Sequence, residues 1–179
     1  ISPGCVGGRQ AHPPKASKIW SQKMNIKERR KAIRSALSAT LSKETVSLRG
    51  HLFNEFPLII EDKLEAIKKT NEVIKILNSI GLENELQRCS IKKVRAGKGK
   101  NRGRKYKTRK GPLIVVSKEC PLIKSSINIP GIDICIINNL NAELLAPGTT
   151  PGRLTIYTES AIEKLKSENL FTNNIKKAE

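Results

Sequence analysis

The fold of this chain is decided by residues 112–158, where polar segments separate three short apolar runs: PLIVVS (112–117), IDICII (132–137) and LTIYT (154–158). A fourth run, FPLII (56–60), occurs earlier and is followed directly by two acids. Each run has the length and the β-branched content of a strand. Continuous apolar runs are typical of parallel strands that are buried on both faces of a sheet.

The segments around these runs predict helices. Residues 63–80 place Leu64, Ile67, Ile74 and Leu77 on one face and end before Gly81, so we expect a single helix there. Further helices are expected at 26–42, with Asn25 as N-cap, at 139–145 and at 159–168. Strands that alternate with helices predict an α/β fold, here a three-layer sandwich with a mainly parallel, Rossmann-like sheet of about four strands and extended basic loops.

Charge is distributed unevenly along the 179 residues, which carry 34 Lys and Arg against 16 Asp and Glu, a net charge of +18. Residues 1–60 have 11 basic and 3 acidic side chains, and residues 91–111 have 11 basic and none acidic. The segments 61–90 and 112–179 are close to neutral. This segregation predicts a polyanion-binding surface attached to a neutral folded body.

The second basic segment, IKKVRAGKGKNRGRKYKTRKG (91–111), is the main candidate for nucleic-acid binding. Its glycines exclude a stable helix, so we expect it to be mobile in the free protein and ordered only against phosphates. The alternatives are a solvated loop or a nuclear-localisation signal. The glycine spacing does not match the dinucleotide-binding fingerprint. The candidate RNA-binding residues are Lys92, Lys93, Arg95, Lys98, Lys100, Arg102, Arg104, Lys105, Tyr106, Lys107, Arg109 and Lys110.

Residues 1–24 are expected to form an extended cationic arm, because their prolines and glycines exclude a helix and they have little apolar surface to bury. The arm's candidate RNA-binding residues are Arg9, His12 and Lys15. His12 has no second ligand at metal-binding spacing. A disordered terminus without a binding role is the alternative. The expected domains are this arm, an α/β domain at 25–171 with the insertion 91–111, and a C-terminal tail at 172–179.

The predicted helix 26–42 carries basic side chains on a face separate from its apolar stripe. Like charges four residues apart weaken an isolated helix, so we expect this face to meet RNA phosphates; a solvated face is the alternative. The candidates are Arg30, Lys31 and Arg34.

The sequence gives little support for reactive thiols, membrane insertion, metal binding or catalysis. The four cysteines are scattered and are expected to be reduced, inert thiols. No apolar stretch approaches the ~20 residues of a membrane-spanning helix, so no membrane partner is expected. We predict no metal, cofactor or catalytic site, because no carboxylate cluster is visible and His51 has no evident partner. An enzyme acting on RNA remains an alternative that a nuclease assay would detect.

Four segments closely resemble one family: GGRQAHPPK (7–15), KERRKAIRSALSAT (27–40), RAGKGKNRGRKYK (95–107) and LAPGTTPGRLTIYTESAIEKL (145–165). The family is that of the universal large-subunit ribosomal protein number four, in its archaeal and eukaryotic form. The resemblance implies a non-catalytic protein with an α/β domain and a long loop that penetrates the rRNA and lines the constriction of the nascent-peptide exit tunnel. The family's N-terminal strand, helix and outgoing loop arm precede the match and are not in this chain, so the sheet is expected to lack one strand.

By the same resemblance, the residues around Arg9 belong to the returning arm of that loop, Arg29 joins Arg30 and Arg34 on the following helix, and Arg153 is either an RNA contact or a structural residue. The implied partners are large-subunit rRNA, neighbouring large-subunit proteins including the other protein of the constriction, and the nascent chain. The implied location is the cytoplasmic ribosome, with nucleolar assembly in a eukaryote. A regulator that binds messenger RNA through the same surface is the alternative.

Overall fold

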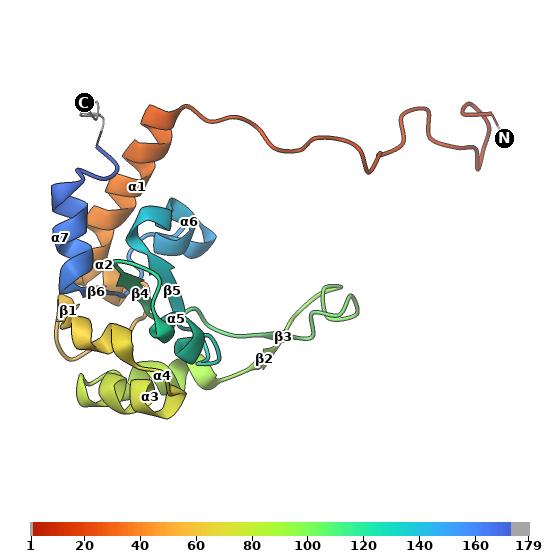
Figure 1. The fold of residues 1–179 in the computed structure, drawn as a ribbon. Coiled ribbons are helices and arrows are strands. Elements are labelled where there is room, and N and C mark those ends of the chain that lie inside the picture. Colours follow the sequence, from red (N-terminus) through yellow and green to blue (C-terminus); the bar gives the residue numbers. More distant parts are fainter. Residues whose placement is uncertain (1, 173–179) are drawn as a thin grey trace.

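A four-stranded parallel sheet lies at the centre of the computed structural model, which describes residues 2–172 (Figure 1). The strand order is β1-β6-β4-β5, and all three pairings are parallel. Leu113 of β4 pairs with Thr155 of β6 on one side and with Asp133 of β5 on the other. The strands are β1 (Leu58–Ile60), β4 (Leu113–Val116), β5 (Asp133–Ile136) and β6 (Thr155–Thr158).

Helices cover both faces of the sheet at β4 and β6, as the continuous apolar runs predicted, whereas Ile59 of the edge strand β1 is 54% exposed. Alternate side chains of β4 enter different cores: Ile114 and Val116 pack into one, and Leu113 and Val115 into the other. The first core is closed by α2 (Lys43–Leu48), the 3-10 helix η1 (Asp62–Ala66), α3 (Thr70–Ser79), α4 (Glu83–Ser90) and α5 (Pro121–Ser126). The second is closed by α1 (Ile26–Thr40), η2 (Ile137–Asn139), α6 (Ala142–Leu145) and α7 (Glu159–Ser167). The predicted three-layer α/β architecture is therefore confirmed.

The prediction of one helix over residues 63–80 is wrong. The chain forms η1, becomes extended at Ile67 (φ −75°, ψ 127°), and begins again as α3 at Thr70. The break is held by contacts remote in sequence, because Ser125 donates a hydrogen bond to the carbonyl of Ile67 over 3.1 Å. Leu64 and Leu77 still enter the same core, so the predicted apolar positions are right although the element is divided.

Three helices were not predicted as such: α2, α4 and α5. The helix expected at 26–42 ends at Thr40, and Ser42 caps α2 by accepting a hydrogen bond from the Thr45 amide. Asn25 precedes α1 in extended conformation, but its side chain makes no capping hydrogen bond. The helix expected at 139–145 is the shorter α6, capped by Asn141 and followed by η3 (Pro147–Thr149). Of the predicted tail, residues 173–179 lie outside the described residues.

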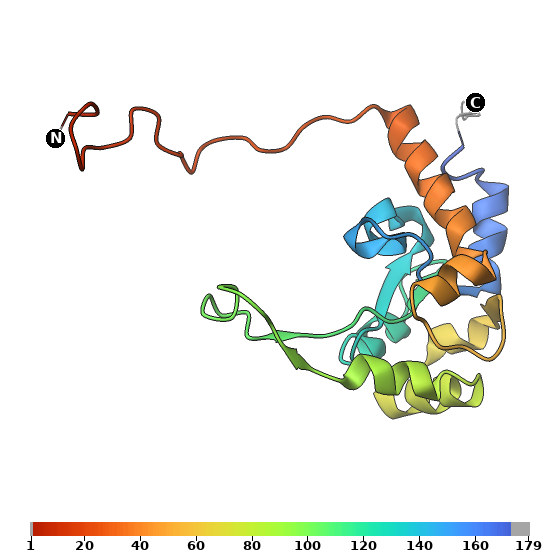
Figure 2. The same ribbon diagram turned by 180° about the vertical axis from the view of Figure 1, so that it is seen from behind.

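Two extensions leave the body. Residues 2–25 form no regular element and run away from α1, and the insertion forms a narrow ribbon in which β2 (Lys93–Val94) pairs antiparallel with β3 (Tyr106–Lys107). Figures 1 and 2 show both extensions on the same side of the body. The sheet and its helices thus carry two projecting basic segments.

Candidate nucleic-acid interface

The ribbon presents its cations to solvent. The turn beyond β2 and β3 is closed by a hydrogen bond from the Arg95 amide to the Lys105 carbonyl (2.8 Å), and two of its glycines adopt positive φ, Gly97 (78°) and Gly103 (79°). Arg95 is half-buried because its guanidinium donates to the carbonyls of Arg104 and Tyr106. The remaining predicted side chains are exposed: Lys92, Lys93, Lys98, Lys100, Arg102, Arg104, Lys105, Tyr106, Lys107, Arg109 and Lys110.

The arm is the second exposed cationic segment, and Arg9, His12 and Lys15 are all exposed on it. It also holds a feature that the prediction missed. Trp20, the only tryptophan of the chain, is 75% exposed, and the ammonium of Lys18 lies 4.6 Å from the centroid of its ring. The signal was present in the sequence, because this lone indole lies between lysines in a segment with no acid before Glu28.

Helix α1 divides its predicted RNA-binding residues into two groups. Arg29 and Lys31 are exposed, as expected of phosphate-binding residues. Arg30 and Arg34 are half-buried and donate hydrogen bonds to the backbone carbonyls of Thr172 (3.1 Å) and Phe171 (2.9 Å). These two guanidiniums therefore fasten the C-terminal end of the described chain onto α1.

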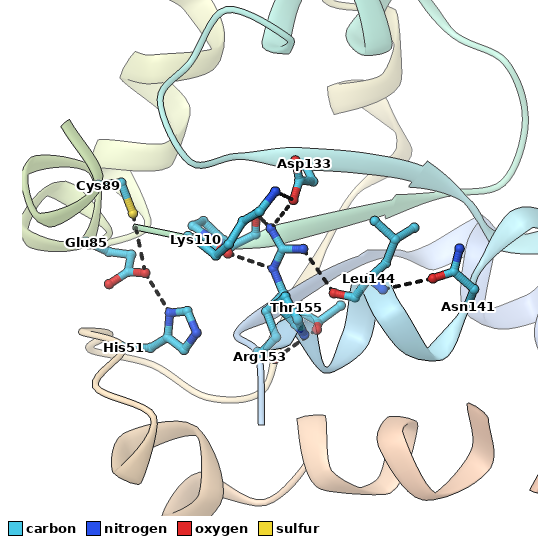
Figure 3. A network of polar contacts seen from close by, with 12 residues as sticks. His51, Glu85, Cys89, Lys110, Asp133, Asn141, Leu144, Arg153 and Thr155 are labelled. Carbon is cyan, nitrogen blue, oxygen red and sulfur yellow. Dashed lines mark hydrogen bonds and ion pairs between the residues drawn. The ribbon is translucent and has the colours of Figure 1, made fainter. Parts of the chain in front are cut away.

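Arg153 lies inside the body. Its side chain has no exposed surface and donates hydrogen bonds to the carbonyls of Gly111 (2.8 Å) and Leu144 (3.0 Å) and to the Asp133 carboxylate (2.7 Å) (Figure 3). Lys110, from the root of the ribbon, binds the same carboxylate oxygen over 2.9 Å. Of the two roles that the sequence left open for Arg153, these contacts fit the structural one.

His51 has a partner that the sequence did not reveal. Its Nδ1 lies 2.7 Å from the carboxylate of Glu85, which is fully buried and also accepts hydrogen bonds from Arg88 and from the Leu52 amide. Burial alone raises the pKa of Glu85, but these donors outweigh burial and lower that pKa to about 2. The group is thus a buried, charged anchor between α4 and the loop after α2.

Burial raises the pKa of three thiols, those of Cys89, Cys120 and Cys135. All four cysteines are free, and burial, together with the charge of Glu85, raises the pKa of Cys89 to about 11. Among residues 2–172, no group of three or more His, Cys, Asp or Glu side chains is placed to hold a metal ion. None of the described helices has the length and apolar character needed to cross a membrane.

The structure defines the class of the protein as a basic α/β protein with two solvent-exposed cationic extensions. Within that class, the chain belongs to the ribosomal protein L4/L1 family, whose sequence model matches residues 1–168. The resemblance seen in the sequence is therefore confirmed, and the family is one of ribosomal constituents.

Curated relatives of this family are about half identical to the chain over the matched residues. It is 48% identical over 176 residues to the large ribosomal subunit protein uL4 of Methanosphaera stadtmanae, a match that covers 96% of this chain and 67% of the relative. It is 53% identical over 167 residues to uL4 of Nanoarchaeum equitans, covering 93% and 62%. It is 45% identical over 167 residues to uL4 of Archaeoglobus fulgidus, covering 92% and 66%. The chain thus spans about two thirds of the length of these relatives.

Proposed function

We propose that the chain is a structural constituent of the large ribosomal subunit that binds and stabilises folded rRNA. The observation that carries this proposal is the ribbon, which has eleven basic and no acidic side chains in residues 91–111 and exposes nearly all of them. Binding of a flexible cationic segment to phosphates is favoured by charge-assisted hydrogen bonds and by the release of counterions. The relatives' names support the ribosome as the location.

The contacts we propose lie on three elements. The ribbon supplies most of the cations, the arm supplies Arg9, His12 and Lys15, and α1 supplies Arg29 and Lys31. Recognition is of RNA shape and phosphate spacing, because lysines and arginines on flexible segments read the backbone rather than base edges. Tyr106, 53% exposed beside Lys105, and Trp20 are placed to stack on unpaired bases.

The rRNA proposal is tested by measuring the affinity for a large-subunit rRNA transcript as a function of salt. The triple variant Arg102→Ala, Arg104→Ala, Lys105→Ala should weaken binding and reduce the slope of log Kobs against log[salt] by roughly 2, since each lost phosphate contact removes about 0.7–0.9. Its control is Lys68→Ala, Lys75→Ala, Lys124→Ala, which removes three exposed cations from the body. Equal effects of the two triple variants would show that net charge, and not the ribbon, binds RNA.

We further propose that the arm reaches towards the nascent-peptide exit tunnel and contacts neighbouring large-subunit proteins and the nascent chain. Support comes from its extended course away from the body and from the family to which the chain belongs. Cys5 offers a handle, because it is the one exposed cysteine of the four. A photo-crosslinker on Cys5, in reconstituted large subunits, should capture rRNA and nascent chains. Crosslinks confined to proteins of the outer surface would contradict this placement.

A further inference from the structure

A cleft lies at the root of the ribbon, between the ribbon strands and the loop after α2. Its volume is about 660 Å³, and its walls carry six basic side chains: Arg49, Arg88, Lys93, Lys107, Arg109 and Lys110. No carboxylate is among the described residues that line it. Four of the six come from the ribbon strands and the segment that continues them: Lys93, Lys107, Arg109 and Lys110. Arg49 and Arg88 belong to the body and were not predicted to bind RNA.

Two of the lysines are held in an unfavourable arrangement. Lys93 and Lys107 are directly opposite each other in the antiparallel β2–β3 pair. Like charges in that position repel, since the Cβ atoms of such a pair are about 5 Å apart. Within residues 2–172, neither ammonium has an acidic partner, although both line the cleft.

The body side of the cleft includes Arg49, His51 and Arg88, and the last of these is paired with the buried Glu85 over 2.6 Å. Arg49 donates hydrogen bonds to the carbonyls of Pro147 (2.6 Å), Pro151 (3.3 Å) and Thr150, so its guanidinium is fixed in place. Burial, and after it the charges of Arg153 and Arg88, lower the pKa of Arg49. His51, another lining residue, has a buried Nε2 with no hydrogen-bond partner in the described part of the chain.

We propose that this root cleft seats the phosphate backbone of an RNA strand, with a phosphodiester bridging Lys93 and Lys107. An anion there relieves the repulsion between the two ammonium groups and meets the guanidinium of Arg49; the neighbouring Arg88 is already paired with Glu85. RNA is favoured over an acidic peptide because the cleft continues into the exposed cations of the ribbon, so that one strand can follow both. The inference rests on the proposed rRNA binding and adds the cleft and its body residues to it.

Acetylation footprinting of the whole chain tests the cleft directly. On addition of a large-subunit rRNA transcript, Lys93 and Lys107 should become protected from acetylation, whereas the exposed Lys68 and Lys75 of the body should react as before. If Lys93 and Lys107 react equally fast with and without bound RNA, the cleft is not an RNA site. Protection by a poly-glutamate peptide but not by RNA would overturn the inference in favour of a protein partner.

A pair of matched variants gives an independent measurement. Lys93→Gln with Lys107→Gln should reduce the salt slope of rRNA binding by about 0.7–0.9, the share of the one phosphate that the two lysines bridge. Lys68→Gln with Lys75→Gln, an equal change of charge, should leave it unchanged. The cleft variant should melt no lower than the unmodified protein, because it removes a repulsion. If it binds as the control does while the Arg102, Arg104, Lys105 variant binds weakly, the cleft inference fails and the proposed function stands. If the unmodified chain does not bind rRNA, the proposed function itself fails.

Discussion

The guanidinium of Arg153 joins three segments that are far apart in the sequence. From a fully buried position it donates hydrogen bonds to the carbonyl of Gly111 before β4, to the carbonyl of Leu144 in α6 and to the carboxylate of Asp133 at the start of β5. A buried guanidinium is tolerated only when its charge and its donors are all satisfied. Arg153, although an arginine is the residue type expected of an RNA contact, therefore serves to hold the sheet together.

Replacing Arg153 by Met should therefore destabilise the body. The change leaves two buried carbonyls without donors and removes one of the two cations from Asp133, so we expect a loss of about 3 kcal/mol in the free energy of unfolding, measured by urea denaturation. Lys124→Met on the exposed side of α5 is the control and should change it by less than ~0.5 kcal/mol. A loss below ~1 kcal/mol at Arg153 would contradict the structural role.

Glu85 makes stability depend on pH at the acid end. Its pKa is about 2 in the folded state against an ordinary value of 4.5, so the unfolded chain binds the proton more readily. The stabilisation is complete above pH 4.5 and is lost as the pH falls from 4.5 towards 2, by roughly 2 kcal/mol at pH 3. Urea unfolding at pH 5 and pH 3 should show this loss, and Glu85→Gln, although less stable at both, should show a smaller one. Equal losses in the two proteins would rule out Glu85 as the cause.

At the scale of elements, α1 has two different tasks on one helix. Arg30 and Arg34 hold backbone carbonyls of the C-terminal end, and Arg29 and Lys31 point into solvent. The basic helical face, and for Arg29 the family resemblance, had predicted RNA binding for all four. The difference arises because residues 171–172 return to α1, a contact across more than 130 residues of chain.

Paired variants of α1 should separate these tasks. Arg29→Ala with Lys31→Ala should weaken rRNA binding and leave the melting temperature within about 2 °C. Arg30→Ala with Arg34→Ala should lower the melting temperature by several degrees, since two hydrogen bonds from charged donors are worth about 1.5–3 kcal/mol each. Binding assays and thermal melts of both variants check this. The same pattern in both pairs would show that α1 has one task.

The ribbon is an element with almost no tertiary support. Its two strands have two residues each, and all residues from 92 to 110 are exposed except Arg95 and Gly99, which are half-buried. We expect fast amide hydrogen exchange at 96–104 in the free protein and slower exchange with rRNA bound, whereas β4 should be protected in both states. Strong protection of the turn without RNA would contradict folding on binding.

At the scale of the whole molecule, stability and binding are carried by different parts of the chain. The buried apolar side chains begin at Ile33, and the backbone hydrogen bonds described for the arm join its own residues. The arm and the ribbon hold much of the positive charge and little of the core. A protein of this build can lose an extension without losing its fold.

Deleting residues 1–24 should therefore leave the thermal melt within about 2 °C of the unmodified chain, because no core side chain is removed. The same deletion should weaken rRNA binding and lower its salt slope, since Arg9, Lys15, Lys18 and Lys23 leave with it. Circular dichroism and salt-dependent binding measure the two effects. A large fall in the melting temperature would mean that the arm packs on the body.

The sequence by itself determined the strands, the layers and the place of the charge. A continuous apolar run such as PLIVVS predicts a buried strand, and a segment with eleven cations and no acid cannot enter a core. These are local properties, so no knowledge of neighbours was needed. For the same reason the glycine-rich stretch and the arm could be recognised as extensions before their conformation was known.

Only the tertiary structure decided which cations face outward. Arg30, Arg34 and Arg153 have the same chemistry as the exposed arginines, and the carbonyls and carboxylate that bind them lie 9 to 142 residues away in the chain. The pairing of His51 with Glu85, the break after η1 and the opposition of Lys93 to Lys107 depend in the same way on remote contacts. Hydrogen bonds and ion pairs are fixed by distance in space, and distance in space follows from how the whole chain packs.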